Sequence, residues 1–203
     1  ARVSFSKGGA RTMVDFVFPN ESIQVRGDSS STALSITTLN SFDGTTRFLT
    51  KAGGFRMKCL NGQLLGDIVG SYSSTHSPNL SVEKGAAQVI RMCQQFRQAE
   101  EYWGAMMQTQ VSDEVAAYVI MEFFDKDDSD VLLKNNDCSA VYQLWRQYNK
   151  EMGQNAYALY NALTDWVSHK ESKQGANGRI HRERKLTKAL QADVFQPAQL
   201  ALA

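Results

Sequence analysis

A strand–turn–strand pattern in the first third of the chain most constrains what it can fold into. Residues 34–38 alternate between apolar or β-branched side chains and smaller polar ones, the period of two that is typical of a half-buried strand. The dipeptide Asp43-Gly44 follows, and it is favoured in tight hairpin turns because the central residues must tolerate positive φ. The pattern therefore predicts an antiparallel β-hairpin around residue 44.

A third strand is expected over residues 55–60, after a reversal at Gly53-Gly54. Its odd-numbered residues are apolar and should face the core, while Arg56 and Lys58 should face solvent. With the helical positions described below, the expected core side chains are Phe55, Met57, Cys59, Phe96, Trp103, Phe123, Trp145 and Trp166.

The remainder of the chain has a helical pattern. Ser81 is a preferred N-cap, and apolar side chains recur at helical spacing from there to Met107. Ser112 begins a second helix, and a third runs from about residue 137 to His169, with Gly153 as a kink. We therefore predict an α+β fold, in which an N-terminal antiparallel β-meander packs against C-terminal helices that cover one of its faces. The expected organisation is a single domain, residues 1–203, with a mainly β part (1–80), a helical part (81–169) and a basic arm with a C-terminal helix (170–203).

Composition narrows the class of protein. Of the 203 residues, 42% are hydrophobic, which is sufficient for a sizeable core. No run of about 18 apolar residues predicts a membrane span, and the N-terminal residues do not resemble a signal peptide. The three cysteines lack CxxC spacing, so neither a disulfide framework nor a cysteine zinc site is expected. These features predict a protein of a reducing cytoplasm.

Positive charge is concentrated near the C-terminus. Residues 169–188 contain seven Lys or Arg and two Glu, a local charge of +5, whereas the formal charge of the whole chain is +1. Gly175 and Gly178 predict that this segment is a mobile arm. A mobile cationic arm can neutralise phosphates and release counterions, as nucleic-acid-binding proteins do. A solvated surface loop is the alternative explanation of the same charges.

A second group of cations lies on the predicted strands. Arg47 and Lys51 share one strand face, and Arg56 and Lys58 share a face on the next strand. If the two faces coincide, they form a positively charged groove of the kind that holds single strands. Alternatively, the cations only keep an exposed sheet soluble. The candidate nucleic-acid-binding residues are Arg47, Lys51, Arg56, Lys58, Arg179, Arg182, Arg184 and Lys185.

Evidence for catalysis or metal binding is weak. Asn161, Asp165 and His169 fall on one helix face, and a carboxylate beside an imidazole can act as a general base. No nucleophile of matching spacing accompanies them, however, and a surface ion pair explains the same residues, so no catalytic residue is predicted. The chain has no HxxxH or CxxC motif, calcium loop or glycine-rich phosphate loop, so neither a metal nor a cofactor is expected.

Three motifs resemble those of a domain-of-unknown-function family found in phages, prophages and plasmids. They are LNSFDGT at residues 39–45, FRMKCLNG at residues 55–62, and the basic, glycine-containing segment near the C-terminus. The resemblance covers most of the chain, residues 39–190, and implies a mobile-element setting that favours recombination, replication or counter-defence. The family-motif residues that it implies are Asn40, Asp43, Gly44, Arg56, Cys59, Asn61, Gly62, His76, Asn161, Asp165 and His169.

The leading hypothesis combines this resemblance with the basic residues. A β-meander followed by a helix also resembles, in architecture, the strand-annealing proteins of phage recombination. We therefore expect a homo-oligomeric protein of a phage or mobile element that binds single-stranded nucleic acid, most simply DNA, in the cytoplasm of a bacterial host. The alternative is a non-catalytic oligomeric interaction or structural protein of a phage. A third hypothesis is an enzyme that uses Asp165 and His169.

Overall fold

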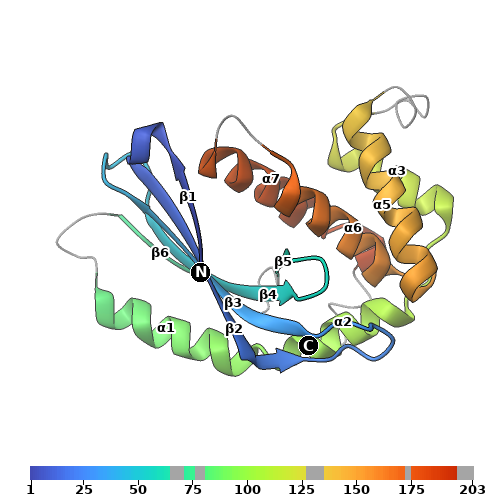
Figure 1. The fold of residues 1–203 in the computed structure, drawn as a ribbon, viewed down its shortest axis with the longest axis horizontal. Helices are drawn as coiled ribbons and strands as arrows, with labels where there is room; N and C mark the ends of the chain where they lie inside the picture. The colour runs from blue at the N-terminus through green and yellow to red at the C-terminus, as the bar shows by residue number, and fades with distance from the viewer. Residues whose placement is uncertain (65–70, 76–80, 127–134, 172–174, 196–203) are drawn as a thin grey trace.

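The first part of the protein is an antiparallel sheet of six strands. The computed structural model describes residues 1–64, 71–75, 81–126, 135–171 and 175–195. The strand order is β1-β2-β3-β4-β5, and β6 pairs with β4 beside β5. Figure 1 shows the strands as one curved sheet. Their bounds are β1 (Arg2–Ser6), β2 (Arg11–Ile23), β3 (Thr32–Ser41), β4 (Phe48–Arg56), β5 (Asn61–Leu64) and β6 (Ser71–Ser74).

The predicted hairpin at Asp43-Gly44 is confirmed, since it lies in the loop between β3 and β4, where Gly44 has a φ of +68°. The predicted reversal at Gly53-Gly54 is wrong. Both glycines lie inside β4, where Gly53 pairs with Ser35 on one side and Leu64 on the other. The chain reverses later, at residues 57–60, so Met57 and Cys59, which were expected on the inward face of a strand, lie in the turn.

Six helices follow the sheet in the described part of the chain. They are α1 (Val82–Gln95), α2 (Gln98–Gln108), α3 (Asp113–Phe123), α5 (Asn136–Met152), α6 (Ala156–His169) and α7 (Ala176–Ala189). Ser81 and Ser112 cap α1 and α3 as predicted, because each hydroxyl oxygen accepts a hydrogen bond from a backbone N–H of the first turn. The long helix predicted to end at His169 is instead two helices, broken at Gly153, whose φ is +90°.

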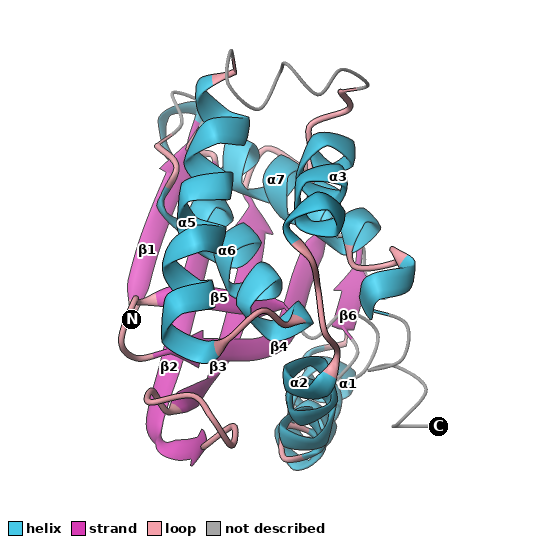
Figure 2. Cartoon of the chain, turned by 90° about the vertical axis from the view of Figure 1, so that its right-hand side faces the viewer, coloured by secondary structure: helices cyan, strands magenta, loops and turns pink. Residues whose placement is uncertain are grey.

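Helices cover both faces of the sheet, so the prediction of one covered face is wrong. Helix α1 packs on β4 and β6, where Gly85 meets the ring of Tyr72. Helices α6 and α7 lie on the other side of the sheet (Figure 1). On that side Arg179 of α7 reaches Asp15 of β2. Figure 2 shows α5 and α6 in front of the strands, with β1 at the edge of the sheet. The α+β fold, with its N-terminal antiparallel meander and C-terminal helices, is confirmed.

Most of the apolar core joins the helices to the middle of the sheet. Of the predicted core residues, Phe96, Trp103, Phe123 and Trp145 are buried, whereas Phe55, Cys59 and Trp166 are half-buried. Met57 is exposed, because the turn after β4 carries it away from the sheet. No helix in the described part of the chain is long and apolar enough to cross a membrane.

Candidate functional site

A groove of about 720 Å³ lies between the sheet and α7. Part of its lining is an apolar cluster, in which Met13 and Leu39 are buried and Leu49 and Ile180 pack against them. The basic side chains that line the groove are Arg11, Arg47, Lys51, Arg184 and His181. The groove thus places cations around apolar side chains, a combination that suits a ligand with both anionic and apolar parts.

Three arginines supply most of the charge of this groove. Arg47 and Arg184 are exposed, and neither forms an ion pair with any residue that the structure describes. Arg11 is oriented by uncharged groups, since its Nη1 donates to Asn177 Oδ1 at 2.6 Å and its Nη2 to Thr45 Oγ1 at 2.6 Å. The positive charge of all three arginines is therefore available to an anion.

Glu183 is the only acid among the described residues that line the groove. Its Oε2 accepts a hydrogen bond from Lys51 Nζ at 2.6 Å, and its Oε1 accepts one from Arg179 Nε at 3.0 Å. Burial opposes ionisation of Glu183, but the charges of Lys51 and Arg179 outweigh it and hold the pKa of Glu183 below its ordinary value. The carboxylate is thus neutralised locally and does not cancel the charge of the three arginines.

Arg179 fastens α7 to the sheet. Its Nη1 and Nη2 donate to the two carboxylate oxygens of Asp15 on β2, with Nη2 3.0 Å from Oδ1. Thr37 Oγ1 donates to the same Asp15 oxygen at 2.7 Å. Burial lowers the pKa of Arg179, but the charge of Glu183 and the hydrogen bond to Asp15 outweigh this effect and raise it above the ordinary value. The predicted mobile arm is therefore wrong for residues 176–189, which form a docked helix.

Two further cations of the predicted arm, Arg182 and Lys185, also contact the protein itself. The guanidinium of Arg182 lies 6.0 Å from the ring centroid of Trp166, and its Nε donates to the carbonyl oxygen of Val167 at 3.2 Å. Lys185 Nζ donates to Asp125 Oδ2 at 2.6 Å. Of the four arm residues predicted to bind nucleic acid, only Arg184 lines the groove.

The family motif around Asp43 shapes one end of the groove. Asp43 Oδ1 accepts hydrogen bonds from Ser41 Oγ at 2.8 Å, from Thr45 N at 3.1 Å and from Thr45 Oγ1 at 2.5 Å. This folded turn presents Thr45 to Arg11, and it continues into Arg47. Of the predicted strand cations, Arg47 and Lys51 do share the groove.

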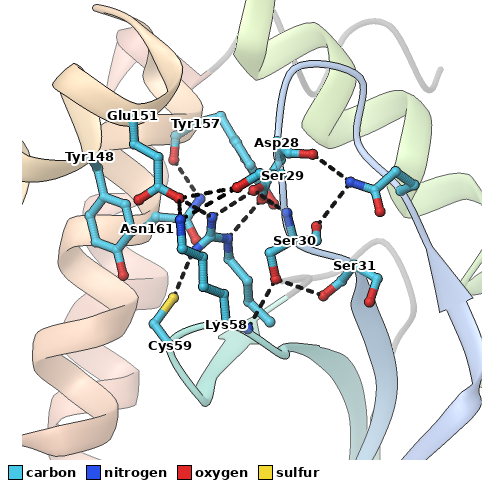
Figure 3. Close-up of polar contacts among 12 residues, drawn as sticks. Asp28, Ser29, Ser30, Ser31, Lys58, Cys59, Tyr148, Glu151, Tyr157 and Asn161 are labelled. Carbon is cyan, nitrogen blue, oxygen red and sulfur yellow. Dashed lines mark hydrogen bonds and ion pairs between the residues drawn. The ribbon is translucent and has the colours of Figure 1, made fainter.

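A second cluster is buried between the sheet and the helices, and Figure 3 shows Asp28, Cys59, Tyr148 and Glu151 among its members. The side chain that these residues share as a partner is Arg56. Arg56 is fully buried, and it donates from Nε to Asp28 Oδ2 at 2.7 Å and from Nη2 to Asp28 Oδ1 at 2.6 Å. Its Nη2 also lies 3.3 Å from Glu151 Oε1, and its Nη1 lies 2.6 Å from Cys59 Sγ. The guanidinium is 5.5 Å from the ring centroid of Tyr148. Every side of this cation is occupied by the protein.

The prediction that Arg56 faces solvent and binds nucleic acid is therefore wrong. In the observed register Arg56 shares its side of β4 with Ala52, which is buried, and not with Lys51, which lines the groove. Lys58 is exposed, but its Nζ donates to Glu151 Oε1. Burial opposes ionisation of Glu151, yet the hydrogen bond from Lys58 and the charge of Arg56 lower its pKa. Neither Arg56 nor Lys58 therefore lines the groove.

Several family-motif residues join the β4–β5 turn to α6. Asn61 Nδ2 donates to Thr164 Oγ1 at 2.8 Å, and the Gly62 N–H donates to Ser168 Oγ at 2.9 Å. Asn161 is buried, and its Nδ2 donates to the carbonyl oxygen of Tyr157 at 2.8 Å. These contacts indicate a packing role. Asn40 lies on β3 opposite Thr12 of β2, and His76 lies outside the described residues.

Asp165 connects the buried cluster to the surface. It accepts a hydrogen bond from Tyr148 Oη at 2.6 Å, and its Oδ1 lies 2.9 Å from Nδ1 of the exposed His169. Burial and the hydrogen bond to Asp165 raise the pKa of Tyr148 above its ordinary value, so this hydroxyl stays protonated. Among the described residues, no group of three or more His, Cys, Asp or Glu side chains is placed to hold a metal ion.

Sequence reasoning missed Arg11, His181 and Asp28. Arg11 shares its side of β2 with Met13, so extending the strand pattern backwards by one step would have placed it on the groove side. Asp28 follows Gly27 in the loop before β3, and nothing in the sequence connects it to an arginine 28 positions away.

Comparison with known proteins gave one match. A family model described as "Domain of unknown function (DUF932)" matches residues 4–191, which is most of the chain. No curated protein and no solved structure matches the chain significantly.

Proposed function

The chain belongs to the DUF932 family of domains of unknown function, and we propose that it binds single-stranded nucleic acid in the groove between the sheet and α7. One observation carries this proposal: Arg11, Arg47 and Arg184 converge on the groove, and none of them is neutralised by a carboxylate of the described residues. Cations that are not neutralised by a carboxylate attract phosphates, and they release condensed counterions when they bind them.

The apolar part of the groove favours nucleic acid over a simple inorganic anion. Leu49 and Ile180 are only partly buried, so they can contact a sugar or a base while the arginines contact phosphates. Proteins that bind single strands without sequence preference combine a cationic groove with surfaces on which bases rest. The limited volume of the groove also favours a single strand over a duplex.

The biological setting belongs to the same proposal. The motifs around Asp43 and Asn61 resemble those of proteins from phages, prophages and plasmids, and single-stranded DNA is an intermediate of recombination and replication in such elements. We therefore propose a role in handling single strands, with strand annealing as its most specific form. The groove would hold the backbone of the strand during this step.

Fluorescence anisotropy with a labelled oligothymidylate, measured over a salt series, tests the proposal. The test variant is Arg47→Ala with Arg184→Ala, and the matched control is Arg146→Ala with Lys150→Ala, two exposed cations of α5 that do not line the groove. The test variant should bind more weakly, and its log–log salt slope should fall by roughly 1.4, since each lost phosphate contact on a single strand removes about 0.7. Absence of binding by the wild type at low salt, or equal effects of the two double variants, would refute the proposal.

A further inference from the structure

An apolar strip is exposed on the sheet, away from the groove. Its members are Val3 and Phe5 of β1 and Phe16 and Phe18 of β2, whose exposed fractions are 48%, 59%, 43% and 43%. Single exposed apolar residues are common on protein surfaces and need no explanation. A contiguous group of this kind is comparable to the largest apolar patch on a typical monomer, and such patches are often functional.

The strand register places the four side chains on one side of the sheet. Val3 pairs with Val14, and Phe16 and Phe18 follow Val14 at two-residue steps, so all share that side. Phe16 and Phe18 pair in turn with Ile36 and Leu34, which are buried in the main core. The strip is therefore the outer continuation of a core face, beyond the reach of α1, which packs on β4 and β6.

The groove lies on the opposite side of the same strands. Met13 and Arg11, which line it, alternate with Thr12 and Val14 along β2. The strip itself contains no charged side chain, whereas a nucleic-acid surface would need cations beside its aromatic rings. The strip therefore differs from the groove in both position and chemistry, and this inference does not depend on the proposed function.

We propose that the strip is the centre of a two-fold symmetric interface with a second copy of this chain, in which the two strips pack face to face. An uncharged apolar surface is complementary to itself, because its copy brings neither like charges nor unpaired polar groups. Sheets that pack in this way lie about 10 Å apart with their side chains interdigitated. The phenyl rings of Phe5, Phe16 and Phe18 supply the large apolar contacts that dominate such interfaces.

The size of the strip indicates a weak, reversible dimer. A buried aromatic side chain removes about 150–250 Å² from water, so four side chains that are half exposed offer on the order of 300–400 Å² per copy. A standard interface buries about 800 Å² per partner, of which the apolar centre is only a part. The strip alone is at most about half of a standard interface, so the dimer should dissociate on dilution.

Sedimentation velocity over a hundredfold range of protein concentration tests the proposal. The wild type should pass from monomer to dimer as its concentration rises, and Phe5→Ser with Phe16→Ser should stay monomeric throughout. The control, Ile90→Ser with Tyr118→Ser, changes two exposed apolar residues on α1 and α3 and should dimerise as the wild type does. Circular dichroism of each variant shows whether its fold is retained.

A second measurement covers the case in which the serine variants do not fold. Phe16→Cys should form a cross-linked dimer with a short bis-maleimide, at a yield above that of the wild type and of Tyr118→Cys. A wild type that is monomeric at every concentration would overturn the proposal, as would a dimer that the strip variants leave intact. Binding of a monomeric wild type to neutral phosphatidylcholine vesicles, or to oligothymidylate through the strip, would replace the second copy by a lipid or a nucleic acid.

Discussion

Arg56 and Asp28 form a fully buried ion pair with two hydrogen bonds, Nε to Oδ2 at 2.7 Å and Nη2 to Oδ1 at 2.6 Å, and neither side chain is exposed to solvent. Asp28 Oδ1 also accepts a hydrogen bond from the Ser30 N–H at 2.9 Å, and Tyr157 Oη lies 3.3 Å from Oδ2. The pair thereby joins the β2–β3 loop, the end of β4 and α6.

Replacing Asp28 by alanine should lower the free energy of unfolding by about 3–5 kcal/mol, because it removes the carboxylate that forms two hydrogen bonds with a buried guanidinium and leaves only the more distant Glu151 to balance its charge. Replacing both partners, Asp28→Leu with Arg56→Met, should cost clearly less than the single change, since no charge then remains buried. Urea unfolding followed by circular dichroism measures both. Lys58→Ala is the control, because its exposed pair with Glu151 should contribute at most about 1 kcal/mol. If the single variant at Asp28, the double variant and Lys58→Ala all lost the same free energy of unfolding, the assignment of a buried ion pair would be contradicted.

Glu183 should make the stability of the protein depend on pH. Its pKa is lower in the folded protein than the ordinary value of 4.5, so its contribution is fully present above pH 4.5 and is lost as the pH falls through the folded-state pKa. Glu183→Gln should therefore be less stable at neutral pH and should lose less stability on acidification. Thermal melts of both proteins across this pH range measure the difference. Glu101→Gln, a change at an exposed position of α2, should follow the wild-type curve, and identical slopes for all three would contradict the prediction.

The local signals in the sequence predicted local structure well. The Asp43-Gly44 turn and the Ser81 and Ser112 caps were found because each depends on backbone groups within three residues. The role of Arg56 could not be found in this way, because Met57 and Cys59, which defined the predicted inward face, lie in the turn after β4 and not in the strand. Arg179 shows a second limit, since its charge suggested a solvated arm while its partner Asp15 lies 164 positions earlier in the sequence. Three of the five basic residues that line the groove, Arg47, Lys51 and Arg184, were therefore predicted from the sequence, but the geometry of the groove was not.

Trp103 tests the packing of the helical core. It is fully buried, and its ring centroid lies 6.4 Å from those of Phe96, Tyr157 and Tyr160. Trp103→Ala should lower the free energy of unfolding by about 3–5 kcal/mol through the cavity that it leaves. Trp103→Phe should cost much less, because the indole Nε1 is buried without a hydrogen-bond partner in the described part of the protein, so no hydrogen bond is lost.

Chemical unfolding of the two Trp103 variants, beside Tyr118→Ala as an exposed control, measures these differences. The control should stay within about 0.5 kcal/mol of the wild type. A phenylalanine variant as unstable as the alanine variant would show that the indole ring makes a polar contact essential to the core.

Substitutions at three neighbouring cations of α7 should affect nucleic-acid binding and the docking of the helix differently. Arg184 lines the groove, whereas Arg182 packs on Trp166 and Lys185 forms an ion pair with Asp125. Arg184→Ala should weaken binding of oligothymidylate and reduce the salt slope by about 0.7, with little effect on the melting temperature. Arg182→Ala should instead lower the melting temperature, because it removes the hydrogen bond to Val167 and the contact with the indole ring. Lys185→Ala should change neither the salt slope nor the melting temperature appreciably, since its ion pair is partly exposed.

Fluorescence anisotropy and thermal melts on the same three preparations measure both quantities. If the three variants lost salt slope equally, α7 would act as a diffuse basic surface. The groove would then no longer be the binding site.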